Sequence, residues 1–180
     1  MRPLCFAAVA ALFSMLALGC SGGKDPKIPG NELGTYHVTG HLGASSCGPG
    51  ALGSSDLWEF DVKLSRDGHD LYWLNGKDVV PGRIAADGVS FAFDSRSVVQ
   101  AEVAGKGKPG CTIVRTDKAS GALHEQGTDV TGFDGLMRFG YTADPTSDCS
   151  DFIGVEGGFD GLPCEMSYQV DAARTAGPST

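Results

Sequence analysis

A two-residue alternation of apolar and polar side chains constrains this chain more than any other feature. In the segment 57–64 the even-numbered positions are large and apolar, and the odd-numbered positions from Glu59 to Lys63 are charged. Side chains of a strand point alternately to its two faces, so this segment predicts a strand with one buried face. The segment 164–171 alternates in the same way. The two apolar faces consist of Trp58, Phe60, Val62 and Leu64, and of Cys164, Met166, Tyr168 and Val170.

Short segments of β-forming residues recur between glycine-rich turns. The 27 glycines among 180 residues disfavour helix interiors, and Asp67-Gly68 and Asp87-Gly88 are typical of turns between antiparallel strands. After residue 33 no long segment has the apolar stripe of an amphipathic helix. We therefore predict an all-β fold over residues 34–172, a single antiparallel up-and-down β-barrel or a closely related β-sandwich. Further strands are expected at 35–42, 71–74, 89–93, 98–103, 111–116, 122–125 and 136–141.

The first residues form a secretory leader that ends at a cysteine. Arg2 supplies a positive start, residues 4–18 are almost wholly apolar, and Gly19 precedes Cys20. The apolar stretch has 15 residues, fewer than the roughly 20 that a helix needs to cross a bilayer. A secreted chain is therefore expected rather than one anchored by a transmembrane helix.

This leader resembles the signal of bacterial lipoproteins, in which Leu, a small residue and Gly or Ala precede the lipidated Cys. Cys20 and the glycine before it match, whereas Ala17 and Leu18 reverse the usual order. The resemblance implies a helical signal peptide over 1–19, cleavage before Cys20, and acyl chains such as palmitate on the new amino terminus and, through diacylglycerol, on the sulfur. Ser21 implies sorting to the outer membrane. The alternative is an ordinary signal peptide that leaves a free secreted protein.

Residues 20–33 are rich in Gly, Pro and Lys and predict a flexible tether, and residues 173–180 predict a loose tail. Two or more acyl chains hold a protein firmly on a bilayer, whereas one holds it marginally. The expected location is therefore the bacterial cell envelope, with the covalent lipid as the contact with the membrane.

Four cysteines remain outside the leader and the lipidation site: Cys47, Cys111, Cys149 and Cys164. In an oxidising compartment they predict two disulfides, for which three pairings exist. We expect Cys149 with Cys164, which closes the shortest loop, and therefore Cys47 with Cys111. The sequence contains no Cys-x-x-Cys, so a structural zinc site is not expected.

The charge of the chain is acidic. Removal of Arg2 with the leader leaves 13 basic and 22 acidic residues, a net charge of −9. Nucleic acid is not an expected partner, because binding to phosphates requires a clustered positive surface. The acidity itself needs no partner, because it keeps a surface protein soluble.

Two groups of residues are candidates for ligand binding. If the fold is a barrel, its aromatic residues line an apolar pocket for a small molecule, or else they fill a solid core. A loop with Asp144, Asp148 and Asp151 offers oxygen ligands for calcium, although turns in which these carboxylates accept backbone hydrogen bonds explain the same residues without metal. No cofactor is expected. The aromatic candidates are Trp58, Phe60, Trp73, Phe91, Phe93 and Tyr168.

The catalytic motifs of common hydrolases are missing from the sequence. There is no Gly-x-Ser-x-Gly, and His37 and His41 lie about 13 Å apart along a predicted strand, too far to hold one ion together. The start of that strand, Gly34-Thr35-Tyr36, resembles the Gly-x-Trp start of lipocalin-like barrels over these three positions. We expect a non-enzymatic binding or interaction module whose partner is a small apolar ligand or an envelope protein. The alternatives are a secreted hydrolase with an unrecognised site and a structural or surface-coating lipoprotein.

One pentapeptide occurs twice, at 132–136 and at 158–162, with the sequence Gly-Phe-Asp-Gly-Leu. We interpret the two copies as equivalent turns that enter strands, each with a buried Phe, rather than as a paired ligand loop.

Overall fold

A computed structural model describes residues 29–49, 51, 55–105, 107, 109–156 and 158–178. The predicted leader and the predicted lipidation site, Cys20, lie outside this range. Within it the chain forms a closed antiparallel β-barrel, and none of its helices is long and apolar enough to cross a membrane. The elements are β1 (Asn31–Ser45), β2 (Leu57–Asp67), β3 (Asp70–Asn75), β4 (Asp78–Ile84), β5 (Ser90–Glu102), β6 (Cys111–Gln126), β7 (Asp129–Ala143), the 3₁₀ turn η2 (Ser150–Phe152) and β8 (Cys164–Ala176).

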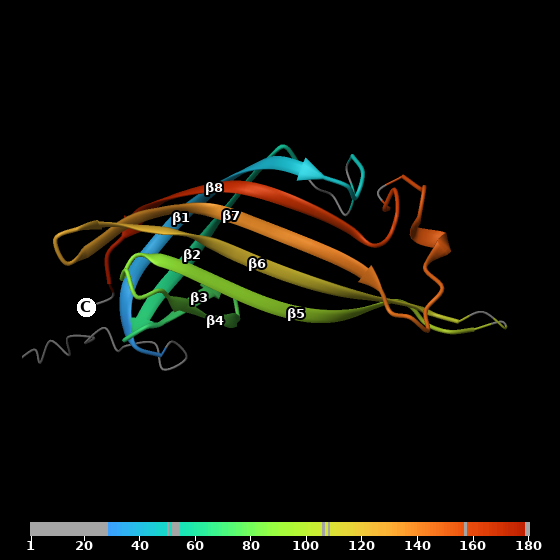
Figure 1. The fold of residues 1–180 in the computed structure, drawn as a ribbon, viewed down its shortest axis with the longest axis horizontal. Coiled ribbons are helices and arrows are strands. Elements are labelled where there is room, and N and C mark those ends of the chain that lie inside the picture. The colour runs from blue at the N-terminus through green and yellow to red at the C-terminus, as the bar shows by residue number, and fades with distance from the viewer. Residues whose placement is uncertain are drawn as a thin grey trace, which may run out of the picture.

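The barrel has up-and-down topology, with each strand paired to the next in the sequence and β8 paired to β1 (Figure 1). The closing pair places His37 opposite Ala173 and Gly40 opposite Val170. Because β1 has strand neighbours on both sides, the sheet is continuous, and the fold is the barrel rather than the sandwich. The predicted inward faces of β2 and β8 are confirmed, since the side chains from Val62 to Leu64 and from Cys164 to Val170 alternate as expected in burial.

Three features of the strands differ from the prediction. The segments expected at 89–93 and 98–103 belong to one strand, β5, and those at 111–116 and 122–125 belong to β6. The residues that join the two predicted segments of each strand are small or charged on both faces. The alternation of hydrophobicity is therefore weak there, although the hydrogen-bonded ladder continues. The strand β4 was not predicted, because Pro81 and Gly82 interrupt it. At the ends, β1 begins at Asn31 and β8 continues to Ala176, which lies opposite Thr35.

The interior of the barrel is filled by aromatic side chains around Phe133. This residue is 1% exposed, and its ring lies 5.8 Å from Tyr36 and 5.7 Å from both Trp73 and Phe91. Rings from β1, β3, β5 and β7 thus meet at one point inside the barrel. Edge and tilted contacts of this kind stabilise a core beyond the burial of apolar area.

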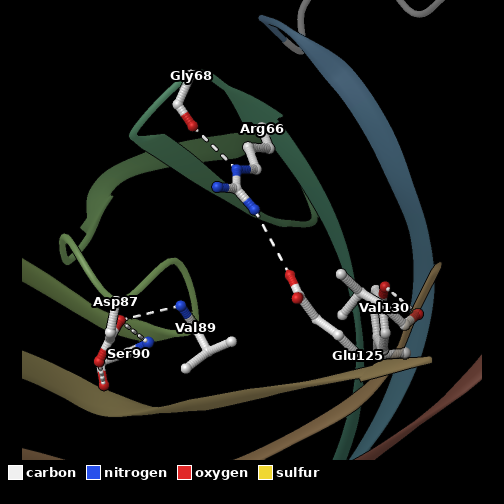
Figure 2. Close-up of polar contacts among 8 residues, drawn as sticks. Arg66, Gly68, Asp87, Val89, Ser90, Glu125 and Val130 are labelled. Carbon is white, nitrogen blue, oxygen red and sulfur yellow. Dashed lines mark hydrogen bonds and ion pairs between the residues drawn. The ribbon is translucent and has the colours of Figure 1, made fainter. Parts of the chain in front are cut away.

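Polar contacts seal the end of the barrel at which β1 begins (Figure 2). Arg66 on β2 donates from Nε to the Gly68 carbonyl at 2.9 Å and pairs with Glu125 on β6 at 3.7 Å. The hydroxyl of the buried Tyr36 donates to the Val130 carbonyl at 3.0 Å. Burial is the main cause that raises the pKa of Tyr36 to about 12, so this donor keeps its proton. We call this end of the barrel the closed end.

The opposite end, which we call the mouth, is open because the strands differ in length. The short strands β3 and β4 stop early, whereas β5 to β8 and β1 continue as a curved sheet (Figure 1). The pairing of β4 with β5 covers only Gly82–Ile84 and Phe91–Phe93. Beyond these residues, no strand of the described chain pairs with this edge of β5.

Two disulfides lie at the mouth, and the expected pairing is wrong. Cys47 pairs with Cys164, and Cys111 with Cys149. The shortest loop is not closed, because the chain after β7 turns toward the start of β6: the amide of Asp148 donates to the Gly110 carbonyl at 3.2 Å. Cys149 is thereby carried to Cys111. The residues that follow β1 lie beside the start of β8 and bring Cys47 to Cys164.

The two copies of the pentapeptide are not equivalent turns. The first, at 132–136, lies within β7, and the second, at 158–162, lies in the loop before β8. Both phenylalanines are buried, Phe133 and Phe159 each being 1% exposed. In the first copy the glycines allow backbones to approach closely, since a Cβ at Gly132 would lie 2.3 Å from the Ala172 carbonyl oxygen.

Truncation of Phe133 tests the aromatic interior. We expect Phe133→Ala to lower the free energy of unfolding by about 3–5 kcal/mol, because three rings lose a common partner. Chemical denaturation with the disulfides intact measures the change. The control is Leu57→Ala at a position that is 49% exposed, with an expected change within about 0.5 kcal/mol. A change of that small size for Phe133→Ala would contradict the packing described.

Candidate functional site

A cavity of about 210 Å³ lies in the mouth, between the turn of β3 and β4 and the inner face of β5 to β7. It borders the place where β4 and β5 cease to pair. Its wall combines apolar and charged side chains, which distinguishes it from the aromatic interior beneath. The charged residues that line it are Asp78, Arg115, Asp117 and Lys118, and the large apolar ones are Trp73, Val80, Phe93 and Met137.

The alternation of β6 turns Arg115 and Asp117 into the barrel. They stand at odd-numbered positions of the strand, as do Cys111 and Ile113, which are buried on its inner face. In the sheet, Arg115 lies between Ser97 on β5 and Tyr141 on β7. A charged pair therefore occupies two consecutive inward positions, directly above the aromatic interior.

The guanidinium of Arg115 is held from two directions. Its Nε donates to Oδ1 of Asp117 at 2.6 Å, and its Cζ lies 4.9 Å from the centre of the Phe139 ring. The two side chains are only 39% and 30% exposed. Burial lowers the pKa of Arg115, but the hydrogen bond and the charge of Asp117 outweigh it, so the net shift is upward and the cation persists. The Nη donors make no hydrogen bond with any residue that the structure describes.

A neighbouring phenol belongs to the same polar group. Burial is the main cause that raises the pKa of Tyr141, with a smaller upward contribution from Asp117 and a downward one from Arg115. The phenol therefore stays protonated at neutral pH. The arrangement offers a fixed cation with free N–H donors beside an apolar wall, which suits binding of a hydrogen-bond acceptor.

The six predicted aromatic residues form mainly a packed core. Trp58 contacts Phe60 and Tyr168, with ring centres 4.5 and 5.6 Å apart. Trp73 lies 5.9 Å from Phe60 and 5.5 Å from Phe93, which in turn contacts Phe91 at 5.7 Å. Of the six, Trp73 and Phe93 also line the mouth cavity.

The acidic loop after β7 is organised by local hydrogen bonds. Oδ1 of Asp144 accepts from the amide and the hydroxyl of Thr146, and Oδ1 of Asp148 accepts from those of Ser150. These contacts lower the pKa of Asp144. Among the described residues no group of three His, Cys, Asp or Glu side chains, Asp151 included, could hold a metal ion.

Two histidines pair with carboxylates on the outer wall. His37 Nδ1 lies 2.9 Å from Asp61 Oδ1, and His124 Nε2 lies 2.6 Å from Asp134 Oδ1. The four side chains are between 45% and 66% exposed. In the part of the chain that the structure describes, no serine or threonine hydroxyl hydrogen-bonds to either imidazole, so neither pair forms an activated nucleophile.

A wider depression of about 480 Å³ lies on the outside of the wall over β4 to β7. Arg83, Lys118 and Arg138 border it, and all three are exposed. Solvated cations hold a ligand less firmly than the half-buried Arg115, so we regard the mouth as the stronger candidate.

No protein-family model, curated protein or solved structure matches this chain. The function is therefore inferred from the residues of the mouth.

Arg115, Asp117 and Met137 were not predicted as site residues. The sequence contains one signal for these charges. Arg115 and Asp117 stand at odd-numbered positions, as do the apolar Cys111 and Ile113, so both charges lie on the inner face once β6 is known to be continuous. The strand predicted at 111–116 ends before Asp117, so the sequence does not assign the two charges together to one inner face.

His37 provides a test of the outer-wall electrostatics. The hydrogen bond with Asp61 is the main cause that raises the pKa of His37; burial is the next cause and lowers it, and the charges of Asp61 and Glu59 raise it further. We expect a histidine titration by NMR to show a lower His37 pKa in Asp61→Asn than in the natural protein. The stabilisation by this pair is present below the ordinary histidine pKa of about 6.5 and is lost as pH rises through the folded value. An unchanged His37 pKa in the variant would contradict the contact.

Proposed function

We propose that this protein is a non-enzymatic lipoprotein of the bacterial envelope that binds a small amphipathic molecule in the mouth of its barrel. The observation that supports the proposal most directly is the inward pair Arg115 and Asp117 at the edge of the cavity. The ligand would place an acceptor group, such as a carboxylate, on Arg115 and an apolar part against Trp73 and Met137.

The ion pair is poorly explained as a device for stability. Removing two charges from water costs several kcal/mol per ion before their attraction is counted, and apolar residues of similar size often stabilise a core as well or better. A guanidinium with its Nε pinned by Asp117 and its face on Phe139 has little freedom left to lose on binding. These two points favour a binding role for Arg115.

The strand β1 begins at the end of the barrel opposite the proposed site. The tether would reach the domain at Asn31, beside Arg66 at the closed end. The mouth is at the other end, where the disulfides lie. A domain held in this way can direct its mouth away from the membrane that carries it.

Loss of the Arg115 charge should weaken binding of an anionic probe. As probes we choose indole-3-acetate, which has a carboxylate and a flat apolar body, and indole, which lacks the carboxylate. We expect Arg115→Met to weaken binding of indole-3-acetate about tenfold or more while affecting indole much less. Titration followed by NMR measures both affinities, with shifts expected at the Trp73 indole N–H.

Arg96→Gln is the matched control, because Arg96 lies on the same sheet but is exposed on the outer face. The Arg96→Gln variant should bind both probes with the same affinity as the natural protein. Equal weakening by the two variants, or no binding of the carboxylate probe to the natural protein, would contradict the proposed site.

The lipid anchor is tested by the intact mass of the protein purified from membranes. We expect a chain that begins at Cys20 and carries the added mass of a diacylglycerol and an amide-linked acyl chain. Cys20→Ser should leave the membrane fraction. An unmodified chain that begins elsewhere would show that the leader is an ordinary signal peptide.

A further inference from the structure

One edge of β5 has no neighbouring strand over most of its length. The pairing with β4 ends at Phe93, whereas β5 continues to Glu102 and pairs on its other side with β6. In Figure 1, β5 runs past β3 and β4 as the last strand along that margin of the sheet. From Asp94 onward, no strand of the described chain covers this edge.

The unpaired edge carries exposed valines. Val98 is 64% exposed and Val99 is 50% exposed, on opposite faces of the strand. A long edge with free N–H and C=O groups and apolar side chains is a template for pairing with another strand. Natural sheets usually protect such an edge with charges or a cover, and the segment from Ser97 to Gln100 has no charged residue.

We propose that two copies of this protein associate by antiparallel pairing of their β5 edges about a two-fold axis at Val98. In this register Val98 lies opposite Val98 of the second copy, Arg96 opposite Gln100, and Ser97 opposite Val99. An isologous contact uses the same edge twice, so each copy supplies both the donor groups and the acceptor groups.

The register is compatible with the faces and charges of the strand. Arg96, Val98 and Gln100 all point outward, since they lie opposite Thr116, Val114 and Thr112 of β6. Each Arg96 therefore meets a Gln100 amide on its own face, and within residues 96–100 no like charges lie directly opposite each other. A register centred on Arg96 would instead place two guanidinium groups together.

The length of the pairing is limited on both sides. A bulge between Gln100 and Glu102 shifts the register at one end, and β4 occupies the edge of β5 up to Phe93 at the other. The contact is thus short, and we expect a weak dimer with a dissociation constant on the order of micromolar or higher. This inference does not depend on ligand binding in the mouth.

Sedimentation at protein concentrations from about 1 µM to 1 mM, the range in which short interfaces associate, measures the fraction of dimer. We expect a reversible monomer–dimer equilibrium that Val98→Lys weakens about tenfold or more, because each interface would contain two lysines at its centre. Leu57→Lys is the matched control at an apolar position that is 49% exposed, and it should leave the equilibrium unchanged. A monomer at every concentration, or equal effects of the two variants, would overturn the proposal.

Cross-linking tests the register itself. Under mild oxidation Val98→Cys should form a disulfide-linked dimer, since the axis brings the two copies of this position together. Val155→Cys, at a position that is 51% exposed, should remain monomeric under the same conditions. Cross-linking of both variants to the same extent would show random collision and would also overturn the proposal.

Discussion

The structure depends on the way aromatic rings fill the inside of the barrel. An eight-stranded barrel has an interior just wide enough for side chains to fill or for one small ligand. Here Phe133, buried to 1% exposure, takes the central position and joins rings from β1, β3 and β5. Strands that are far apart around the wall are thereby held by one cluster, and Tyr36 and Arg66 seal the end beneath it.

Where this filling ends, the chemistry of the interior changes. Above Trp73 and Phe93 the inward positions of β6 hold Arg115 and Asp117 in place of apolar residues. The wall is also incomplete there, because β4 leaves β5 after three paired residues. The two disulfides stabilise this end by closing loops in the unfolded chain, where side-chain packing alone contributes less. The same shortness of β4 that opens the mouth leaves the β5 edge unpaired.

The sequence is sufficient for the all-β class but leaves barrel and sandwich open, and it is insufficient for the site, for related physical reasons. Alternation is clear in β2 and β8, whose inward residues are apolar from Trp58 to Leu64 and from Cys164 to Ala172, and both strands are predicted. Alternation fades where inward residues are polar, as at Arg115 and Asp117, so the predicted strand ends at residue 116, within the candidate site. Disulfide pairing fails as a prediction because sheet neighbours, and not separation along the chain, decide that Cys47 meets Cys164.

The central claim is that a dry aromatic interior gives way to a hydrated polar mouth at Arg115. Magnetisation transfer between water and the protein, measured by NMR on the isotope-labelled chain, tests it most directly. We expect long-lived water contacts at the Arg115 Nη–H groups, whose donors no described residue occupies, and none at the ring protons of Phe133, which should instead show contacts with Tyr36, Trp73 and Phe91. Water at Phe133, or a dry Arg115, would contradict this account of the fold and of its candidate site.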